Sequence, residues 1–250
     1  MRNALSRESK MALARLMAAG PVLAFDFDGT LAPIVDDPKR ARMRPLTRRL
    51  LRRLAEDHPC VVISGRARAD LERRLEGIGV KRIVGNHGAE PWDGEARARQ
   101  SVEAWSAALA PAVAPFRGVH IENKGASLTV HYRRARAKAR ARACIVKAAQ
   151  GLKGARLLPG KLAVSLTPRD APDKGAALCA ELARTGRPRA LYVGDDATDE
   201  DVFALSPRRG VMTVRVGRSV TSRARYFLRG QAEMDELLRA LLALAPRPTE

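Results

Sequence analysis

The sequence predicts an α/β protein whose parallel sheet is interrupted by a smaller α+β unit. Short apolar runs alternate with amphipathic helices between residues 22 and 85, which is the pattern of consecutive βαβ units. Residues 119–133 instead alternate polar and apolar side chains with a period of two, as half-buried antiparallel strands do. The strand–helix alternation returns after Lys174, so we expect the antiparallel unit to be inserted into the parallel one.

The first part of the chain contains the opening elements of the parallel sheet. A proline begins the second helix, where its fixed φ and missing N–H are tolerated, and leucines recur on one face of that helix. The expected strands lie at residues 22–27, 61–64 and 83–85, and the expected helices at 1–20, 45–57 and 69–75.

The middle and last parts supply the remaining elements. The middle is expected to contain helices at 101–113 and 135–150 and strands at 119–122, 127–133, 155–158 and 161–167. The last part is expected to contain helices at 174–183, 198–205 and 234–244 and strands at 190–194 and 211–216. Residues 1–92 and 170–250 are therefore predicted to form the parallel core, and residues 93–169 the inserted α+β domain.

The chain is strongly basic, with a formal net charge of +19 at pH 7. Most of the excess is Arg on Ala/Arg-rich helices, of which the stretch 133–147 is an example. A solvated helix face explains it, because Ala and Arg are both strong helix formers. Aromatic residues make up only 4% of the chain, so stacking platforms for single-stranded nucleic acid are poorly supplied. Nucleic acid is disfavoured as a partner, although a basic nucleic-acid-binding protein or polynucleotide phosphatase stays open as an alternative of another class.

The cysteines and the distribution of apolar residues bear on the cellular compartment in which the protein is expected. Cys60, Cys144 and Cys179 are far apart and lie in apolar contexts, which predicts buried thiols rather than disulfides or a zinc site. No apolar run approaches the roughly 20 residues that a membrane span needs, and the N-terminal segment lacks the continuous apolar core of a secretory signal. We expect a cytoplasmic protein without membrane contact, with a monomer favoured.

Two aspartates follow the first apolar strand and form the most informative motif. Asp26 and Asp28 are two residues apart at a strand end, so their side chains are expected on the same side. Burying two like charges together is costly unless a cation or a shared proton offsets the repulsion. The motif alone fits phosphoryl transfer through an aspartyl-phosphate on Asp26 and, equally well, the simpler interpretation of a strand end capped by an Asx turn.

Three further polar groups occur at strand ends or helix starts of the same parallel domain. Ser64 and Gly65 follow the next strand, where a hydroxyl and free backbone N–H groups suit an anion. Lys174 begins a helix, a position where the macrodipole disfavours a cation unless an anion accompanies it. Five carboxylates follow a buried strand within residues 194–201, and a hard divalent cation accounts for such a cluster better than helix capping alone.

Together these groups resemble the motifs of the haloacid dehalogenase (HAD) superfamily of phosphotransferases. The motifs DxDGT, Ser, Lys and GDDxxD occur here in that superfamily's order and in matching contexts. The resemblance implies a Rossmann-like HAD core with a parallel sheet, and a cap domain of the C2 type inserted between the second and third motifs.

A finer resemblance is to the trehalose-6-phosphate phosphatase family. Residues 26–34 are similar to that family's first motif, and residues 63–66 with 85–90 to its second motif and the segment after it. In the inserted unit, residues 122–125 with 131–133, and Gly160 with Lys161, resemble its sugar-contacting cap motifs. The resemblance implies a phosphatase that hydrolyses a small-molecule sugar phosphate, trehalose 6-phosphate, to the sugar and phosphate.

The same resemblance implies a role for each matching residue. Asp26 would be the nucleophile, and Asp28 would protonate the leaving oxygen and then deprotonate water. Lys174 would act in catalysis and would bind the phosphoryl oxygens together with Ser64 and Gly65.

The resemblance also implies a metal ion and a sugar site. Mg²⁺ would be held by Asp26, by the backbone carbonyl of Asp28 and by Asp195. Asp196 and Asp199 would act through water or by hydrogen bonds to these ligands. The residues implied in substrate binding are Glu122, Lys124, Arg133, Lys161 and His87.

Ser165 departs from the family pattern. The family usually has Glu four residues after the lysine that matches Lys161, and Ser165 stands there instead. A charge-assisted hydrogen bond contributes roughly 1.5–3 kcal/mol, against about 1 kcal/mol for a neutral one. Serine in place of the carboxylate would therefore weaken the binding of the sugar, while the phosphate chemistry would be unchanged. The nearest alternative function is therefore a HAD phosphatase for a sucrose-, mannosylglycerate- or hexose-phosphate.

Overall fold

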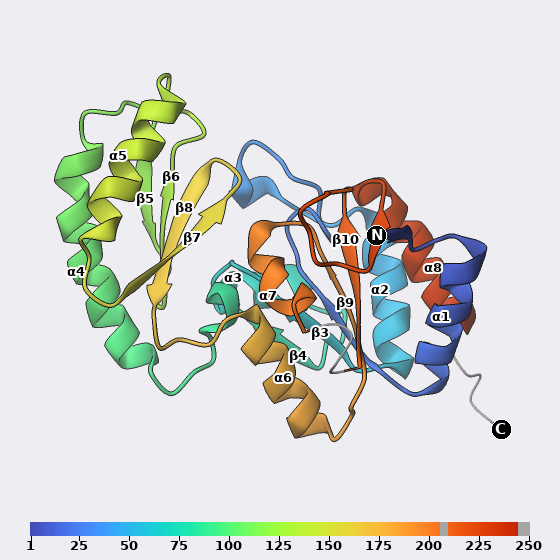
Figure 1. Ribbon diagram of the computed structural model, residues 1–250. Helices are drawn as coiled ribbons and strands as arrows, with labels where there is room; N and C mark the ends of the chain where they lie inside the picture. Colours follow the sequence, from blue (N-terminus) through green and yellow to red (C-terminus); the bar gives the residue numbers. More distant parts are fainter. Residues whose placement is uncertain (206–209, 245–250) are drawn as a thin grey trace.

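The computed structural model describes residues 1–205 and 210–244, which form two sheets (Figure 1). All neighbouring strands of the seven-stranded sheet are parallel. Their spatial order is β1 (Arg2–Asn3), β11 (Tyr226–Leu228), β10 (Val211–Val216), β9 (Ala190–Gly194), β2 (Val22–Phe25), β3 (Cys60–Ile63) and β4 (Arg82–Val84). The central strands β9, β2 and β3 are therefore neighbours, although they are far apart in the sequence.

Helices cover both faces of this parallel sheet because the side chains of each strand alternate between the faces. Leu23 and Phe25 pack in one core cluster, and Val22 and Ala24 in the opposite one. The first cluster also receives α1 (Arg7–Ala18), α2 (Pro45–Asp57), α3 (Arg68–Leu75) and α8 (Met234–Leu244). The second receives α6 (Lys174–Thr185) and α7 (Glu200–Phe203). The α/β class with a parallel sheet is confirmed.

The second sheet is antiparallel and is covered by helices on one face only (Figure 1). Its strand order is β5 (His120–Asn123), β6 (Leu128–His131), β8 (Ala163–Pro168) and β7 (Ala155–Gly160). Val130 and Leu166 pack against the two helices, α4 (Glu95–Val113) and α5 (Lys138–Gln150). The register pairs Glu122 with Thr129 and Thr129 with Ser165, so these three residues share the opposite, uncovered face.

This antiparallel unit lies within residues 95–168, inside the range expected for the insertion. We propose the same division for the described residues, with 1–92, 170–205 and 210–244 as the core and 93–169 as the cap. Asn86 connects the two parts: its Oδ1 accepts a hydrogen bond from Ser127 Oγ (2.6 Å), and its Nδ2 donates to the Lys124 carbonyl (3.2 Å). Both residues belong to the turn between β5 and β6.

Some elements differ from the expectation. Strands β1 and β11 were not expected, because two or three residues are too few to show a periodicity. The first helix begins at Arg7, and α5 begins at Lys138 after a turn in which Ala135 N–H donates to the Tyr132 carbonyl (3.0 Å). The helix expected at 198–205 is shorter. The described residues also contain four short 3₁₀ helices: η1 (Pro38–Arg40), η2 (Asn86–Gly88), η3 (Ala197–Asp199) and η4 (Gln231–Glu233). Within the described residues, no helix combines the length and apolar character that crossing a membrane requires.

Candidate active site

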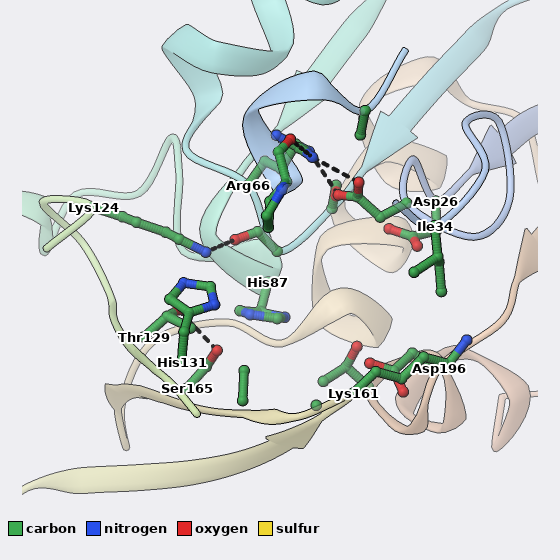
Figure 2. A pocket seen from close by; sticks show the side chains of 18 of the residues that line it. Asp26, Ile34, Arg66, His87, Lys124, Thr129, His131, Lys161, Ser165 and Asp196 are labelled. Carbon is green, nitrogen blue, oxygen red and sulfur yellow. Dashed lines mark hydrogen bonds and ion pairs between the residues drawn. The ribbon is translucent and has the colours of Figure 1, made fainter. Parts of the chain in front are cut away.

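A cavity lies between the carboxyl ends of the central parallel strands and the uncovered face of the antiparallel sheet (Figure 2). All of the residues implied in catalysis and substrate binding line it. Of the residues implied in metal binding, Asp199 does not line it, but one of its carboxylate oxygens lies within 4.8 Å of oxygens of Asp26 and Asp195. Asp26, Ser64 and Asp195 follow strands β2, β3 and β9. Because neighbouring parallel strands end at one edge of a sheet, residues separated by up to 169 positions in sequence reach one cavity.

Asp26 is buried and bonded to a buried lysine. Its Oδ1 accepts a hydrogen bond from Lys174 Nζ (3.0 Å), and Lys174 Nζ also donates to Asp199 Oδ1 (2.7 Å). Burial raises the pKa of Asp26 well above its usual range, while the Lys174 ammonium opposes that rise. Burial alone would lower the pKa of Lys174, but Asp199 and Asp26 more than offset it and keep the amine protonated.

Asp199 stabilises this arrangement through hydrogen bonds to both of its carboxylate oxygens. Oδ1 accepts from Lys174 and from Tyr192 Oη (2.6 Å), and Oδ2 accepts from the backbone N–H groups of Asp195 (2.7 Å) and Asp196 (2.8 Å). Although burial raises the pKa of Asp199, Lys174 and these donors bring it below its usual value. With both oxygens engaged, Asp199 suits the role of holding the acidic loop better than direct contact with a metal.

Asp195 has a different environment, because one of its oxygens lacks a partner. Its Oδ2 pairs with Lys161 Nζ at 2.5 Å, whereas its buried Oδ1 has no hydrogen-bond partner. Burial raises the pKa of this carboxyl to about 6. Gly29, at φ +83°, passes so close that a Cβ there would lie 2.1 Å from Asp195 Oδ2, so only glycine fits beside this carboxylate.

Asp28 is turned toward an arginine rather than toward the other aspartates. Arg66 Nε donates to Asp28 Oδ2 (2.6 Å) and Arg66 Nη2 to Asp28 Oδ1 (2.7 Å), which makes a bidentate pair. Arg66 Nη1 also donates to Asp70 Oδ2 (2.8 Å). This contact of Arg66 with Asp28 was not predicted from the sequence, although the residue directly follows Ser64 and Gly65.

The loop after β3 and the 3₁₀ helix η2 after β4 bring Ser64, Gly65 and His87 together. Ser64 is buried, and a Cβ at Gly65 would lie 2.3 Å from His87 Cε1, so the glycine is what allows the imidazole to pack there. His87 itself has φ +62°, a strained conformation for a residue other than glycine. Its Nδ1 is buried without a partner, and burial, reinforced by Lys174 and Lys124, lowers its pKa well below the usual value.

Cap side chains reach across the cavity to the core. Lys124 Nζ donates to the Gly65 carbonyl (3.0 Å), as Figure 2 shows, and Lys161 reaches Asp195 from the turn between β7 and β8. Arg133 bridges the two parts, since Nη1 donates to the Val35 carbonyl (3.2 Å) and Nη2 to the Lys161 carbonyl (3.3 Å). The cavity is therefore enclosed by both units of one chain.

Comparisons with known proteins agree with this geometry. The sequence profile described as Trehalose-phosphatase matches residues 24–232. This chain belongs to the trehalose-phosphatase family. The trehalose-phosphate phosphatase of Mycobacterium tuberculosis is 35% identical over 214 residues, which cover 80% of this chain and 54% of that protein. That of Mycolicibacterium paratuberculosis is 37% identical over 198 residues, covering 73% and 50%. The chain thus spans about half the length of the curated relatives that it matches.

Solved structures show the same fold. The C-terminal domain of a C. albicans trehalose-6-phosphate phosphatase aligns with a TM-score of 0.80 at 24% identity, covering 98% of this chain and 99% of that one. A trehalose-6-phosphate phosphatase related protein aligns with a TM-score of 0.72 at 24% identity, covering 89% and 98%. The HAD-type core with an additional α+β unit is therefore the fold of this chain.

The acidic residues of this trehalose-phosphatase family member fit a hard divalent cation. One carboxylate oxygen each from Asp26, Asp195 and Asp199 lie within 4.8 Å of one another. The unpartnered Asp195 Oδ1 is a buried acceptor that a cation would satisfy, and oxygen donors are those that Mg²⁺ prefers. The residues present therefore suit Mg²⁺, which Asp26 and Asp195 would hold through carboxylate oxygens.

Ser165, the departure from the family pattern, faces the cavity (Figure 2). Its Oγ shares a hydrogen bond of 2.9 Å with Thr129 Oγ1, and both residues are almost fully buried. A pair of neutral hydroxyls thus occupies the wall where the family usually has a carboxylate.

Proposed function

We propose that this chain is a trehalose-6-phosphate phosphatase, a phosphoric monoester hydrolase that releases trehalose and inorganic phosphate. Membership of the family supports this activity. The main structural support is that the buried Asp26–Lys174 pair lines a cavity whose opposite wall is formed by the cap. A monomer suffices, because one chain supplies both walls. A cytoplasmic location is part of the same proposal.

In the proposed reaction, a carboxylate oxygen of Asp26 attacks phosphorus and forms an acyl-phosphate while the bond from phosphorus to the sugar oxygen breaks. Asp28 donates a proton to the leaving oxygen and later accepts one from the water that hydrolyses the acyl-phosphate. For both steps Asp28 must turn away from Arg66, to which it is bonded here. When bound, Mg²⁺ would neutralise charge on the phosphoryl oxygens and on Asp26.

Lys174, Ser64 and the Gly65 N–H are placed to stabilise the phosphoryl oxygens. Lys174 is protonated and anchored by Asp199, so its charge is preorganised and costs little rearrangement during the reaction. The cap side chains Glu122, Lys124 and Arg133 would bind sugar hydroxyls, and the enclosed cavity would exclude bulk water.

The direct test is phosphate release from trehalose 6-phosphate and from a panel of other sugar phosphates, with and without Mg²⁺. The highest kcat/KM is expected for trehalose 6-phosphate. A higher value for sucrose, mannosylglycerate or hexose phosphate would favour the second candidate, another sugar phosphatase, for which the Thr129–Ser165 hydroxyl pair is the supporting observation. A polynucleotide substrate has less support, since no residue of α5, which is described throughout, lines the cavity.

Replacing Glu122 or Arg133 by alanine is expected to lower kcat/KM for trehalose 6-phosphate about tenfold or more, which corresponds to roughly 1.4 kcal/mol for each factor of ten. Both side chains line the cavity from the cap, so they would contact the sugar rather than the phosphate. Steady-state kinetics with trehalose 6-phosphate and with p-nitrophenyl phosphate, which has no sugar, checks this. Equal losses on both substrates would mean that these residues are structural.

The substitution Ser165→Glu is expected to lower KM for trehalose 6-phosphate or leave it unchanged, because it restores an acceptor for a sugar hydroxyl. If the natural substrate is another sugar phosphate, an unpaired and partly desolvated carboxylate would instead lower kcat/KM for that substrate. Ser165→Gln is the control, with similar size and no charge. A rise in KM for trehalose 6-phosphate in Ser165→Glu, with the fold verified by circular dichroism, would contradict the assignment of this position.

A further inference from the structure

Two histidines and a glutamate form a cluster on the uncovered face of the cap sheet. His131 Nε2 lies 2.7 Å from Glu122 Oε2, and both residues line the cavity. The His120 ring stacks on the His131 ring, with centroids 4.6 Å apart and planes inclined by 12°. The strand register places His120 directly opposite His131, so the backbone itself aligns the two rings.

The direction of the hydrogen bond follows from the chemistry of the two groups. An ionised carboxylate only accepts hydrogen bonds, so the hydrogen must be on His131 Nε2. The hydrogen bond from His131 lowers the pKa of Glu122 to about 2, which keeps the carboxylate ionised at neutral pH. His131 and Lys124 both approach Oε2, the latter at 3.8 Å, which leaves Oε1 as the oxygen available to a ligand.

Glu122 is important for the proposed sugar site because of its charge. Among the described residues that line the cavity, it is the one carboxylate contributed by the cap, because Ser165 supplies only a hydroxyl. Its side chain is 46% exposed, so without an anchor it would sample several rotamers and would lose that freedom on binding. A donor that fixes the carboxylate before the ligand arrives removes this cost.

We propose that His131 is a positioning residue for sugar binding: stacked on His120, it holds Glu122 so that the free carboxylate oxygen meets a sugar hydroxyl. This inference rests on the proposed sugar phosphatase function. It assigns His131 no contact with the phosphate, so its effect is expected on the binding of the sugar rather than on the chemical step.

The test compares His131→Leu with His131→Gln, each in the natural chain and in the Glu122→Ala background. Leucine fills space but cannot donate, whereas the glutamine amide can replace the Nε2 donor. For trehalose 6-phosphate, His131→Leu is expected to raise KM about tenfold with kcat nearly retained, and His131→Gln is expected to recover most of the loss. In the Glu122→Ala background, His131→Leu is expected to add no further loss, because there is no carboxylate to position.

The p-nitrophenyl phosphate assay and thermal unfolding accompany each variant. Any of three results would overturn the positioning role. His131→Leu could leave KM unchanged, His131→Gln could fail to restore KM, or His131→Leu could raise KM equally in the natural chain and in the Glu122→Ala background. If the natural chain hydrolyses a different sugar phosphate best, the proposed substrate is wrong, and the same four variants are compared on that substrate. If it hydrolyses p-nitrophenyl phosphate but no sugar phosphate, both proposals fail.

Discussion

Replacing Asp26 by asparagine is expected to lower kcat at least a thousandfold while the fold is retained. The amide cannot form the acyl-phosphate, yet its oxygen can still accept the hydrogen bond from Lys174 that Asp26 Oδ1 accepts at 3.0 Å. Burial and the neighbouring Asp199 and Asp195 raise the pKa of Asp26, so its charged form is disfavoured in the folded state. Removing the charge of Asp26 relieves its repulsion with Asp199 and Asp195. This gain offsets the loss of one ionic partner for Lys174, so the fold is expected to be retained.

The measurement is kcat for phosphate release together with the midpoint of thermal unfolding. Asp57→Asn makes the same chemical change at an exposed position on α2, outside the cavity, and serves as the matched control. Retention of more than about a thousandth of the original kcat, equivalent to roughly 4 kcal/mol of barrier, would exclude Asp26 as the nucleophile.

Removing divalent cations is expected to abolish activity, and Mg²⁺ is expected to restore it. The acidic groups Asp26 and Asp195 would otherwise repel the anionic substrate, and Asp195 Oδ1 has no partner within the described structure. Ca²⁺ is expected to inhibit, because its larger and looser coordination spoils the alignment that in-line attack requires.

Activity after EDTA treatment, followed by addition of Mg²⁺ or Ca²⁺, tests this expectation. A readout that needs no turnover is thermal unfolding: at a Mg²⁺ concentration about 100 times Kd, binding stabilises the folded state by about 2.7 kcal/mol. The unfolding midpoint should therefore rise with Mg²⁺ in the natural chain and much less in Asp195→Asn. Full activity in metal-free buffer would refute a metal-dependent mechanism.

The main elements of the core and the residues at its strand ends could be predicted because they depend on local patterns. An apolar run that stops at a polar residue identifies both a strand and its end, as for Asp26 after β2, Ser64 after β3 and Asp195 after β9. Parallel strands then end at a common edge whatever their separation in the chain. The prediction that these residues lie together needed no knowledge of side-chain conformations.

Features that depend on side-chain conformation or on very short elements could not be predicted in the same way. Tyr192 lies in a buried apolar strand and resembles an ordinary core residue, yet its hydroxyl bonds Asp199. Asp199 and Asp196 cap η3 through reciprocal hydrogen bonds, which is why α7 begins only at Glu200. The contacts of Arg66 with Asp28 and of His131 with Glu122 could not be predicted either, because the positions of two residues in the sequence do not tell whether their side chains touch.

The cap is attached to the core by bonds of two different kinds on its two sides. Near β5 and β6, the Ser127–Asn86 bond is neutral and buried, and salt has little effect on such a bond. At the turn between β7 and β8, the attachment is ionic, and the Lys161 side chain is 50% exposed, so dissolved ions weaken it. Added salt is therefore expected to loosen the Lys161–Asp195 contact more than the Ser127–Asn86 contact.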